Sequence, residues 1–188
     1  MIIKDDLAAG VAGEHLACAD LIMQGHNAFL SDQGLPYDVV ADIGGKLLRV
    51  QVKTTRGPRK VPQRTNHTPA YVFHVKKCGK KGQGEYTDND VDLFALVALD
   101  TKTVGYLTRE DMRRTLIIRV EEHRGQYLNE LQSAETPEVL RLHGEGLSNV
   151  EVGKRLGMSN SRVARVLKGQ TYDAGTYLTD LTLENALK

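Results

Sequence analysis

The chain has few cysteines and no long apolar run, and each absence excludes a class of protein. Its two cysteines, Cys18 and Cys78, are sixty positions apart and lie in no paired cysteine or histidine spacing. This distribution argues against a zinc site and a disulfide framework, and it fits a reducing compartment. No stretch approaches the roughly 20 apolar residues of a membrane span, and the N-terminus has no apolar run of signal-peptide length. We therefore expect a soluble, cytoplasmic protein.

Acidic residues are missing from one long segment. From Ile43 to Gly84 there are eleven Lys or Arg residues and no Asp or Glu, whereas Glu85 to Glu135 holds eleven acidic and six basic residues. The net charge of +1 hides this segregation. It predicts a basic surface, and basic surfaces attract phosphate backbones. A solvated lysine-rich face is the alternative interpretation of the same pattern.

The N-terminal segment, residues 5–24, is predicted to be a helix. Apolar residues recur there at spacings of three and four, and they define one buried stripe of Leu7, Val11, Cys18 and Leu21. Glu14 occupies the position that completes this stripe. Because burying an unpaired carboxylate is costly, Glu14 needs a partner such as a metal ion or a cation. A structural salt bridge is the alternative.

A β-hairpin is predicted around Gly44-Gly45, a two-residue turn signal flanked by runs rich in Val and Leu. With the glycines at the turn, Asp38 lies opposite Gln51, and Lys53 shares their face because it follows Gln51 by two. The other face is entirely apolar, which supports this register, and carries Val39, Ala41, Ile43, Leu48, Val50 and Val52. Three polar groups therefore meet at one end of the hairpin.

The remaining pattern up to residue 128 is that of an α/β domain. Further strands are predicted at Tyr71–Val75, at the continuous apolar run Val91–Leu99 and at residues 103–107 and 115–120, with a short helical turn near Glu110–Arg114. One helix followed by a mixed sheet and a later helix gives an α/β sandwich in residues 1–128.

Residues 136–170 are predicted to form a small all-α module with the pattern of a helix-turn-helix. Ser148 and Glu151 form a capping-box pair, Gly157 supplies the turn, and Ser159 caps the last helix. The predicted core of this module comprises Val150, Leu156, Met158, Val163, Val166 and Leu167. A three-helix module without a role in DNA binding is the alternative. Residues 171–188 form a C-terminal tail to which the sequence assigns no role.

Glu14 on the first helix, Pro36-Tyr37-Asp38 on one strand and Gln51-Val52-Lys53 on the next resemble the signatures of the PD-(D/E)XK nuclease superfamily. The resemblance covers about residues 8–120. It extends to Holliday-junction-resolvase-like nucleases and to a group I intron homing endonuclease with Gln in place of the second acid. It implies a restriction-endonuclease-like mixed sheet flanked by helices. It also implies a cytoplasmic location in a bacterial or phage-infected cell.

The resemblance also implies a reaction, the Mg²⁺-dependent hydrolysis of a DNA phosphodiester, with Mn²⁺ as a substitute ion. Glu14 and Asp38 would bind the ion, Gln51 would complete its shell or hold one of its waters, and Lys53 would orient the attacking water or neutralise transition-state charge. Gln51 departs from the family pattern, because an amide oxygen is a poorer ligand than a carboxylate. Three explanations are open: Glu14 supplies the missing charge, a single metal is used, or catalysis has been lost. We favour the first.

Two regions are predicted to bind DNA. Basic residues of the loops near the site would contact backbone phosphates: Arg56, Arg59, Lys60, Arg64, Lys76, Lys77, Lys80 and Lys81. The last helix of the helical module would enter the major groove and present Asn160, Ser161, Arg162, Arg165 and Lys168, with Arg162 or Arg165 contacting bases. The six histidines show no ligand spacing and are interpreted as ordinary core or surface residues.

Three functions remain open from the sequence. The favoured one is a sequence-directed endonuclease of homing or restriction type that acts on double-stranded DNA as a homodimer or homotetramer, since two cuts need two sites. A Holliday junction resolvase acting on branched DNA shares the catalytic residues. A non-catalytic DNA-binding regulator on a nuclease scaffold is the third, and Gln51 is the feature that favours it.

Overall fold

The computed structural model describes residues 3–60, 69–79, 82–84, 86–124, 136–167 and 176–188. Chain contacts divide the protein into two compact units. The first comprises Met1–Glu121 together with Thr176–Lys188, and the second comprises Glu122–Gly175. Within the described residues, no helix combines the length and the apolar character required to cross a membrane.

The first unit is built on a mixed sheet with the strand order β1-β2-β3-β7-β8. These strands are β1 (Asn27–Leu30), β2 (Val39–Ile43), β3 (Lys46–Thr55), β7 (Leu93–Ala98) and β8 (Thr103–Thr108). β3 and β7 run parallel, and the other neighbouring strands of this sheet are antiparallel. The predicted α/β class with a mixed sheet is confirmed.

The predicted hairpin register is confirmed. Val40 pairs with Arg49 and Asp42 with Leu47, and the turn between β2 and β3 is Gly44-Gly45. Both glycines have positive φ, 60° and 80°, as a tight turn matched to the twist of the strands requires. The apolar face predicted for this hairpin packs into the main core of the unit.

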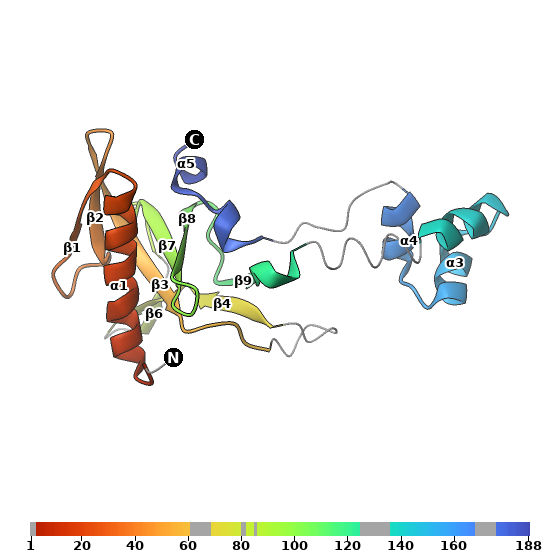
Figure 1. Ribbon diagram of the computed structural model, residues 1–188, viewed down its shortest axis with the longest axis horizontal. Coiled ribbons are helices and arrows are strands. Elements are labelled where there is room, and N and C mark those ends of the chain that lie inside the picture. Colours follow the sequence, from red (N-terminus) through yellow and green to blue (C-terminus); the bar gives the residue numbers. More distant parts are fainter. Residues whose placement is uncertain (1–2, 61–68, 80–81, 85, 125–135, 168–175) are drawn as a thin grey trace. The chain divides into compact units, whose positions relative to one another are not determined.

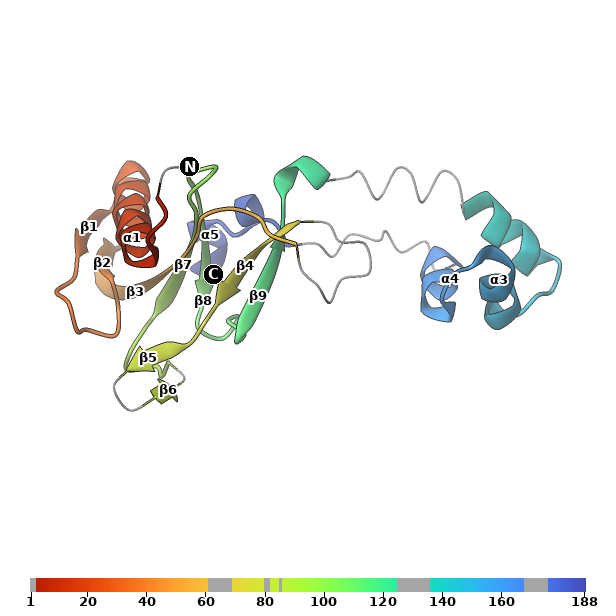
Figure 2. The same ribbon diagram turned by 90° about the horizontal axis from the view of Figure 1, so that it is seen from below.

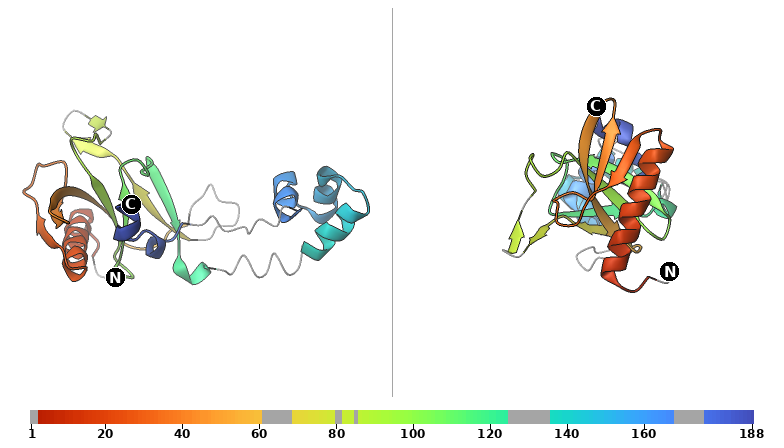
Figure 3. Two further views of the ribbon diagram at one scale, coloured as in Figure 1. Left: turned by 90° about the horizontal axis from the view of Figure 1, so that it is seen from above. Right: turned by 90° about the vertical axis from the view of Figure 1, so that its left-hand side faces the viewer.

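Two layers cover opposite faces of the sheet. Helix α1 (Asp6–Met23) lies over one face, where its core includes alternate residues of β7: Leu93, Ala95 and Val97 (Figures 1 and 3). The intervening residues Leu96 and Ala98 belong to a second core, formed with the antiparallel ribbon of β4 (Ala70–His74) and β9 (Thr115–Arg119) (Figure 2). Every residue of β7 is buried, as the continuous apolar run predicted.

The C-terminal residues 176–188 complete the second layer of the first unit. They form a 3-10 turn, η2 (Leu178–Asp180), and a short helix, α5 (Leu183–Ala186). Leu178 is buried in the second core and Leu183 in the first, and the backbone N–H of Tyr106 donates to the carbonyl of Leu181 at 2.6 Å. Residues 176–188 of the segment to which the sequence assigned no role are therefore part of the first unit.

A two-stranded ribbon and a 3-10 turn lie outside the main sheet. β5 (Lys77–Gly79) pairs antiparallel with β6 (Gly82–Gly84), and the 3-10 turn η1 (Glu121–His123) follows β9. The helical turn expected near Glu110–Arg114 is a hydrogen-bonded turn instead, in which the N–H of Met112 donates to the carbonyl of Arg109 at 3.1 Å.

Helix α1 has the predicted bounds but a different buried face. Asp5 caps it by accepting a hydrogen bond from the N–H of Ala8 at 2.9 Å. Leu7 is 77% exposed and Val11 is 42% exposed, so the predicted stripe is wrong at these two positions. It is confirmed at Leu21, which is buried, and Cys18 packs partly buried against the core. The buried stripe has a spacing of four and consists mainly of small residues: Ala9, Gly13, Ala17 and Leu21. Small side chains occupy most of the buried positions because the helix packs very close to the sheet.

Gly13 is the point of closest approach between α1 and β3. A Cβ atom added at Gly13 would overlap the side chain of Thr54, whereas one added at Gly10 would meet no atom within 4 Å. Gly13 therefore sets the height of α1 above the sheet, and with it the position of the neighbouring Glu14.

The second unit is a small three-helix module. Residues 136–144 are helical and are followed by α3 (Asn149–Leu156) and α4 (Asn160–Leu167). The predicted capping box of Ser148 and Glu151 is present, and Gly157 ends α3 with φ 65°. The carbonyl of Ser159 accepts the first hydrogen bonds of α4.

The core of this module differs from the prediction at one position. Val150 is 45% exposed, and Val152 is buried in its place. Val152 and Leu156 are one helical turn apart and face Val139, Leu142 and Val163 of the neighbouring helices. Val150 lies two residues before Val152, which places it on the opposite side of α3.

Replacing Gly13 by Ala is expected to destabilise the first unit by about 1–3 kcal/mol, because the added methyl forces α1 away from Thr54. Gly10→Ala in the same helix is the matched control. It should stabilise the fold by about 0.5–1 kcal/mol, because alanine favours helix and the site has room. Chemical denaturation measures both changes. Equal stability of the two variants would contradict close packing at Gly13.

Candidate active site

Asp38 is fixed at the start of β2 by hydrogen bonds of its backbone to both neighbouring strands. Its N–H donates to the carbonyl of Val50 at 2.9 Å, and its carbonyl accepts from the N–H of Ser31 at 2.9 Å. Its side chain turns toward β3, where Oδ2 accepts hydrogen bonds from the backbone N–H of Val52 at 2.7 Å and from Nε2 of Gln51. The carboxylate is thus held by residues of the Gln51-Val52-Lys53 signature, as the predicted hairpin requires.

Gln51 is the one buried polar side chain among the described residues, with 8% of its surface exposed. Its Nε2 donates both to Asp38 and to the carbonyl of Val52, the latter at 3.2 Å. An amide nitrogen has two N–H donors, so these two contacts use both of them. The amide oxygen is therefore the atom of Gln51 that remains available to a ligand.

Glu14 lies beside this pair, on the face of α1 next to Gly13. Partial burial raises the pKa of Glu14 above its ordinary value, and the negative charge of Asp38 raises it further. Burial likewise raises the pKa of Asp38, although the Val52 N–H, Lys53 and Gln51 act in the opposite direction. Two carboxylates that are partly removed from water and repel one another favour either protonation or a bound cation.

Lys53 extends the same face of β3, and Tyr86 holds its ammonium. Nζ of Lys53 donates to the hydroxyl of Tyr86 at 2.9 Å and lies 5.1 Å from the centroid of the tyrosine ring. The ring packs edge-on against Phe94 at 5.4 Å between centroids, and Nη1 of Arg109 donates to the carbonyl of Tyr86 at 3.4 Å. Tyr86 is therefore itself fixed in place.

The loop after Tyr86 is fastened to the sheet by Arg49. Nη2 of Arg49 lies 2.7 Å from Oδ1 of Asp92. The backbone N–H of Arg49 donates to Oδ2 of Asp92 at 2.8 Å, and the N–H of Asp92 donates to the carbonyl of Arg49 at 2.9 Å. The guanidinium lowers the pKa of Asp92. Arg109 pairs with Asp88 of the same loop. Asp88 and Asp92 of the acidic segment thus pair with two arginines, one of which, Arg49, belongs to the basic segment.

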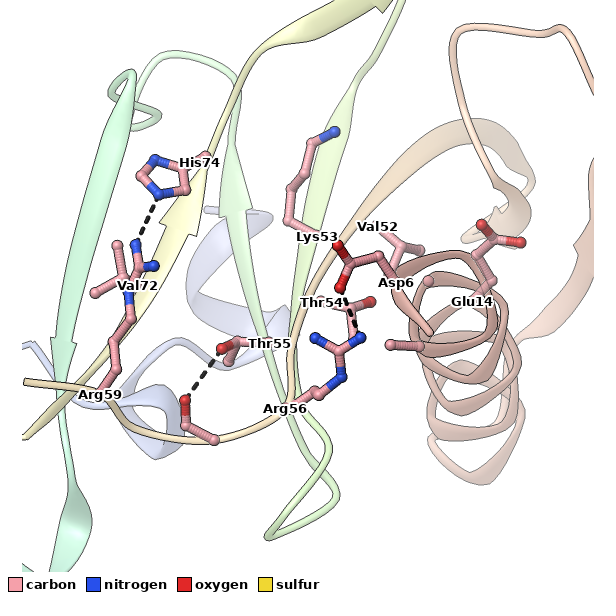
Figure 4. A pocket seen from close by; sticks show the side chains of 13 residues that line it. Asp6, Glu14, Val52, Lys53, Thr54, Thr55, Arg56, Arg59, Val72 and His74 are labelled. Atoms are coloured by element: carbon pink, nitrogen blue, oxygen red, sulfur yellow. Dashed lines mark hydrogen bonds and ion pairs between the residues drawn. The ribbon is translucent and has the colours of Figure 1, made fainter. Parts of the chain in front are cut away.

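A cavity of about 520 Å³ opens beside Glu14 and Lys53 (Figure 4). Glu14, Val52 and Lys53 line one part of it, and Arg59 and His74 line another. The volume is within the range of ligand sites, roughly 300–1,000 Å³. Of the four predicted site residues, Glu14 and Lys53 line this cavity. Asp38 and Gln51 are not among its lining residues, and Asp38 is connected to the other three by its hydrogen bond with Gln51 and by its charge interactions with Glu14 and Lys53.

The predicted phosphate-binding residues are less uniform. Arg56 binds within the first unit: Nε donates to the carbonyl of Ile3 at 3.0 Å, and Nη2 lies 2.6 Å from Oδ1 of Asp6. Arg59, Lys60 and Lys76 are exposed. Arg64, Lys80, Lys81 and Lys168 lie outside the described residues, as do the side chains of Lys77 and Arg165. Asn160 and Ser161 are exposed on α4, and Arg162 is half-buried there.

Two residues near the cavity were not singled out from the sequence, Tyr86 and His74. Tyr86 has no local signal, because it meets Lys53 across 33 positions of the chain. His74 was interpreted as an ordinary residue. The alternation in β4, with Tyr71 and Phe73 buried and His74 exposed, is the pattern that identifies His74 as outward-facing.

The donor set fits a hard divalent cation. Glu14 and Asp38 offer carboxylate oxygens and Gln51 offers an amide oxygen, and oxygen ligands of this kind suit Mg²⁺. In the described ranges, no three His, Cys, Asp or Glu side chains gather as a metal site of protein ligands alone would need. Mg²⁺ commonly keeps several waters and binds through one or two carboxylates plus substrate phosphates. Two carboxylates and an amide meet that need.

The family model described as PD-(D/E)XK endonuclease matches residues 7–136, and the chain belongs to this family. Membership implies DNA as the substrate class, and PD-(D/E)XK nucleases generally use divalent metals such as Mg²⁺.

One similar solved structure is described as a bacterial homing endonuclease, I-Ssp6803I. It shares 17% sequence identity, has a TM-score of 0.49, and the match covers 64% of this chain and 82% of that one. No curated protein matches the sequence.

The raised pKa of Glu14 predicts a pH-dependent gain in stability for Glu14→Gln. A carboxyl whose pKa is higher in the folded than in the unfolded chain destabilises the fold as pH rises through the folded value. Without divalent ions, the variant should have a higher Tm than wild type at about pH 8, and the difference should shrink toward about pH 4. Thermal denaturation in EDTA measures this.

Glu110→Gln, at an exposed carboxylate, reports the effect of removing one negative charge from the surface. A Glu14→Gln curve that ran parallel to that control at every pH would show that Glu14 is not in the repulsive environment described.

Proposed function

We propose that this protein is a Mg²⁺-dependent DNA endonuclease whose active site comprises Glu14, Asp38, Gln51 and Lys53. The observation that carries the proposal is the pairing of Asp38 with the Gln51 amide, which leaves the amide oxygen for a ligand and holds Asp38 where its charge repels that of the partly dehydrated Glu14. When bound, the ion would polarise the scissile phosphate and lower the pKa of a water molecule.

Each of the four candidate site residues has a defined role in this proposal, and so do two of their neighbours. Asp38 and Glu14 hold the cation, and the Val52 N–H keeps the Asp38 carboxylate oriented. Gln51 restrains Asp38 through its nitrogen and offers its oxygen to the ion. Lys53 places a positive charge where the phosphate gains negative charge in the transition state. Tyr86 is a positioning residue, because it contacts the ammonium of Lys53 and not the substrate.

The helical module supports a sequence-directed enzyme of homing or restriction type. Its α3, Gly157 turn and α4 have the order of a helix-turn-helix, and α4 contains no acidic residue. A DNA-reading role for Asn160, Ser161 and Arg162 follows as part of the proposal. Cutting both strands from one site per chain calls for a homodimer or homotetramer.

Asp38→Asn and Lys53→Ala should each reduce the cleavage of supercoiled plasmid by at least about a hundredfold, since each removes charge stabilisation at the phosphate. DNA binding in Ca²⁺ should stay within a few-fold of wild type. Lys46→Ala, an exposed lysine at the start of β3, is the control for loss of one positive charge and should cut normally.

A plasmid left intact by wild type in Mg²⁺ and in Mn²⁺ would instead favour a non-catalytic DNA-binding protein. Preference for a four-way junction over linear duplex in competition would favour a junction resolvase. A second readout is independent of cleavage: Mg²⁺ should raise the Tm of wild type and have a smaller effect on Glu14→Gln.

Tyr86→Phe should lower the single-turnover cleavage rate by about tenfold, because it removes the hydroxyl that accepts from Lys53. The ring and its contact with Phe94 remain, so stability and DNA affinity should change little. Tyr86→Ala removes the ring as well and should approach the rate of Lys53→Ala. Rates unchanged in both variants, or affinity lost in step with rate, would exclude a positioning role.

A further inference from the structure

The cavity that contains Glu14 and Lys53 has a second polar group at a distance from them, formed by Arg59 and His74 (Figure 4). Nη2 of Arg59 lies 2.7 Å from Nε2 of His74. Both side chains are exposed, and both line the cavity. Thr54, Thr55 and Gly57 of β3 and the following turn also line the cavity, together with Arg56 and Asp6, whose charges are paired with each other.

Arg59 and His74 are held by one rigid element. The N–H of Arg59 donates to the carbonyl of Ala70 at 2.9 Å, and the N–H of Ala70 donates back to Arg59 at 3.0 Å. Ala70 begins β4 and His74 ends it, and His74 pairs with Thr115 of β9. Because this ribbon packs through the second core, the two side chains are preorganised rather than gathered from separate loops.

The charge of Arg59 is not neutralised in the way that the charge of Arg56 is. Arg56 binds Asp6 and two backbone carbonyls. In the part of the chain that the structure describes, Arg59 forms an exposed contact with an imidazole and no ion pair with a carboxylate. A guanidinium has five N–H donors in a planar fork that matches phosphate oxygens, and the His74 contact uses few of them.

We propose that Arg59 and His74 form a phosphate subsite, which binds a backbone phosphate of the DNA strand next to the one that is cut. The inference rests on the proposed function. It assigns a ligand to His74 and makes Arg59 part of the active-site cavity rather than of a diffuse basic surface. A strand that enters the cavity would present one phosphate to Lys53 and a neighbouring one to Arg59, whose charge, unlike that of Arg56, is not paired with Asp6.

His74 is able to donate to this phosphate without taking up a proton. Nδ1 of His74 lies 3.4 Å from Oγ1 of Thr115, and a threonine hydroxyl both donates and accepts. With Nε2 accepting from Arg59, Nδ1 carries the hydrogen and donates to Thr115. With a phosphate bound to Arg59, the ring changes tautomer: Nε2–H donates to the phosphate and Nδ1 accepts from the Thr115 hydroxyl.

A first experiment tests the subsite without any cleavage. The probe is 5′-phosphorylated thymidine trinucleotide, titrated in EDTA while the histidine ring ¹H–¹³C resonances are followed by NMR. His74→Gln identifies the His74 signal. We expect a saturable shift of that signal, lost in Arg59→Ala and absent with thymidine, which has no phosphate. A silent His74 signal, or the same shift in Arg59→Ala or with thymidine, would overturn the proposal.

A second experiment locates the phosphate within a DNA duplex that the enzyme cuts. Each phosphate that flanks the cut is replaced in turn by a neutral methylphosphonate. Wild type should lose about tenfold in cleavage rate at one flanking position, the value of one charge-assisted contact. Arg59→Ala and His74→Ala should be slower on normal DNA and insensitive to the same replacement. Lys46→Ala should keep the wild-type sensitivity.

The two experiments separate the inference from the proposed function. Wild type that cuts no DNA overturns the proposed function, while the trinucleotide titration still decides whether Arg59 and His74 bind phosphate. Wild type that cuts DNA, together with an Arg59→Ala variant of undiminished sensitivity at every position, overturns the subsite alone.

Discussion

The close approach of α1 to β3 at Gly13 determines the geometry of the candidate site. Glu14 follows Gly13, so the helix that leaves no room for a side chain against Thr54 also brings a carboxylate beside Asp38. The buried stripe of small residues, and not large apolar ones, makes this approach possible. Core packing and placement of the acids are therefore one feature of the fold.

The two carboxylates are held where neither is fully hydrated and each repels the other. Such an arrangement lowers the stability of the folded chain and is retained in proteins where a ligand or a reaction needs it. Gln51 moderates the repulsion. Its nitrogen donates to Asp38, and an amide in place of a third acid means that one fewer negative charge is confined beside the cavity. A neutral residue at this position is thus compatible with cation binding, at a lower electrostatic cost to the empty site.

The sequence predicted those parts of the structure that local rules determine. The hairpin register from Val39 to Val50 followed from a two-residue glycine turn and a period of two, which act over neighbouring residues, and it brought Asp38 close enough for the Gln51 side chain to contact it. The buried face of α1 was not predictable in the same way, because Leu7 and Val11 have the spacing of a core stripe but the close approach at Gly13 favours a face made mainly of small residues. The prediction that Val150 lies in the core failed for a related reason. Apolar character alone does not show which side of α3 the neighbouring helices cover. The contacts of Lys53 with Tyr86 and of Arg59 with His74 join distant segments, and no period or motif in the chain specifies them.

The connection between the first unit and the helical module has a consequence for how such enzymes diversify. The chain leaves the first unit after β9 and returns at residue 176, where the N–H of Arg119 donates to the carbonyl of Thr176 at 2.9 Å. Arg119 and Thr176 are thus neighbours in space, and the hydrogen bond that joins them lies within the first unit. In sequence, the second unit thus lies between two parts of the first. A unit joined in this way is open to exchange for an unrelated domain, or to loss, while the strands and the helix that carry the acids, the amide and the lysine stay unchanged.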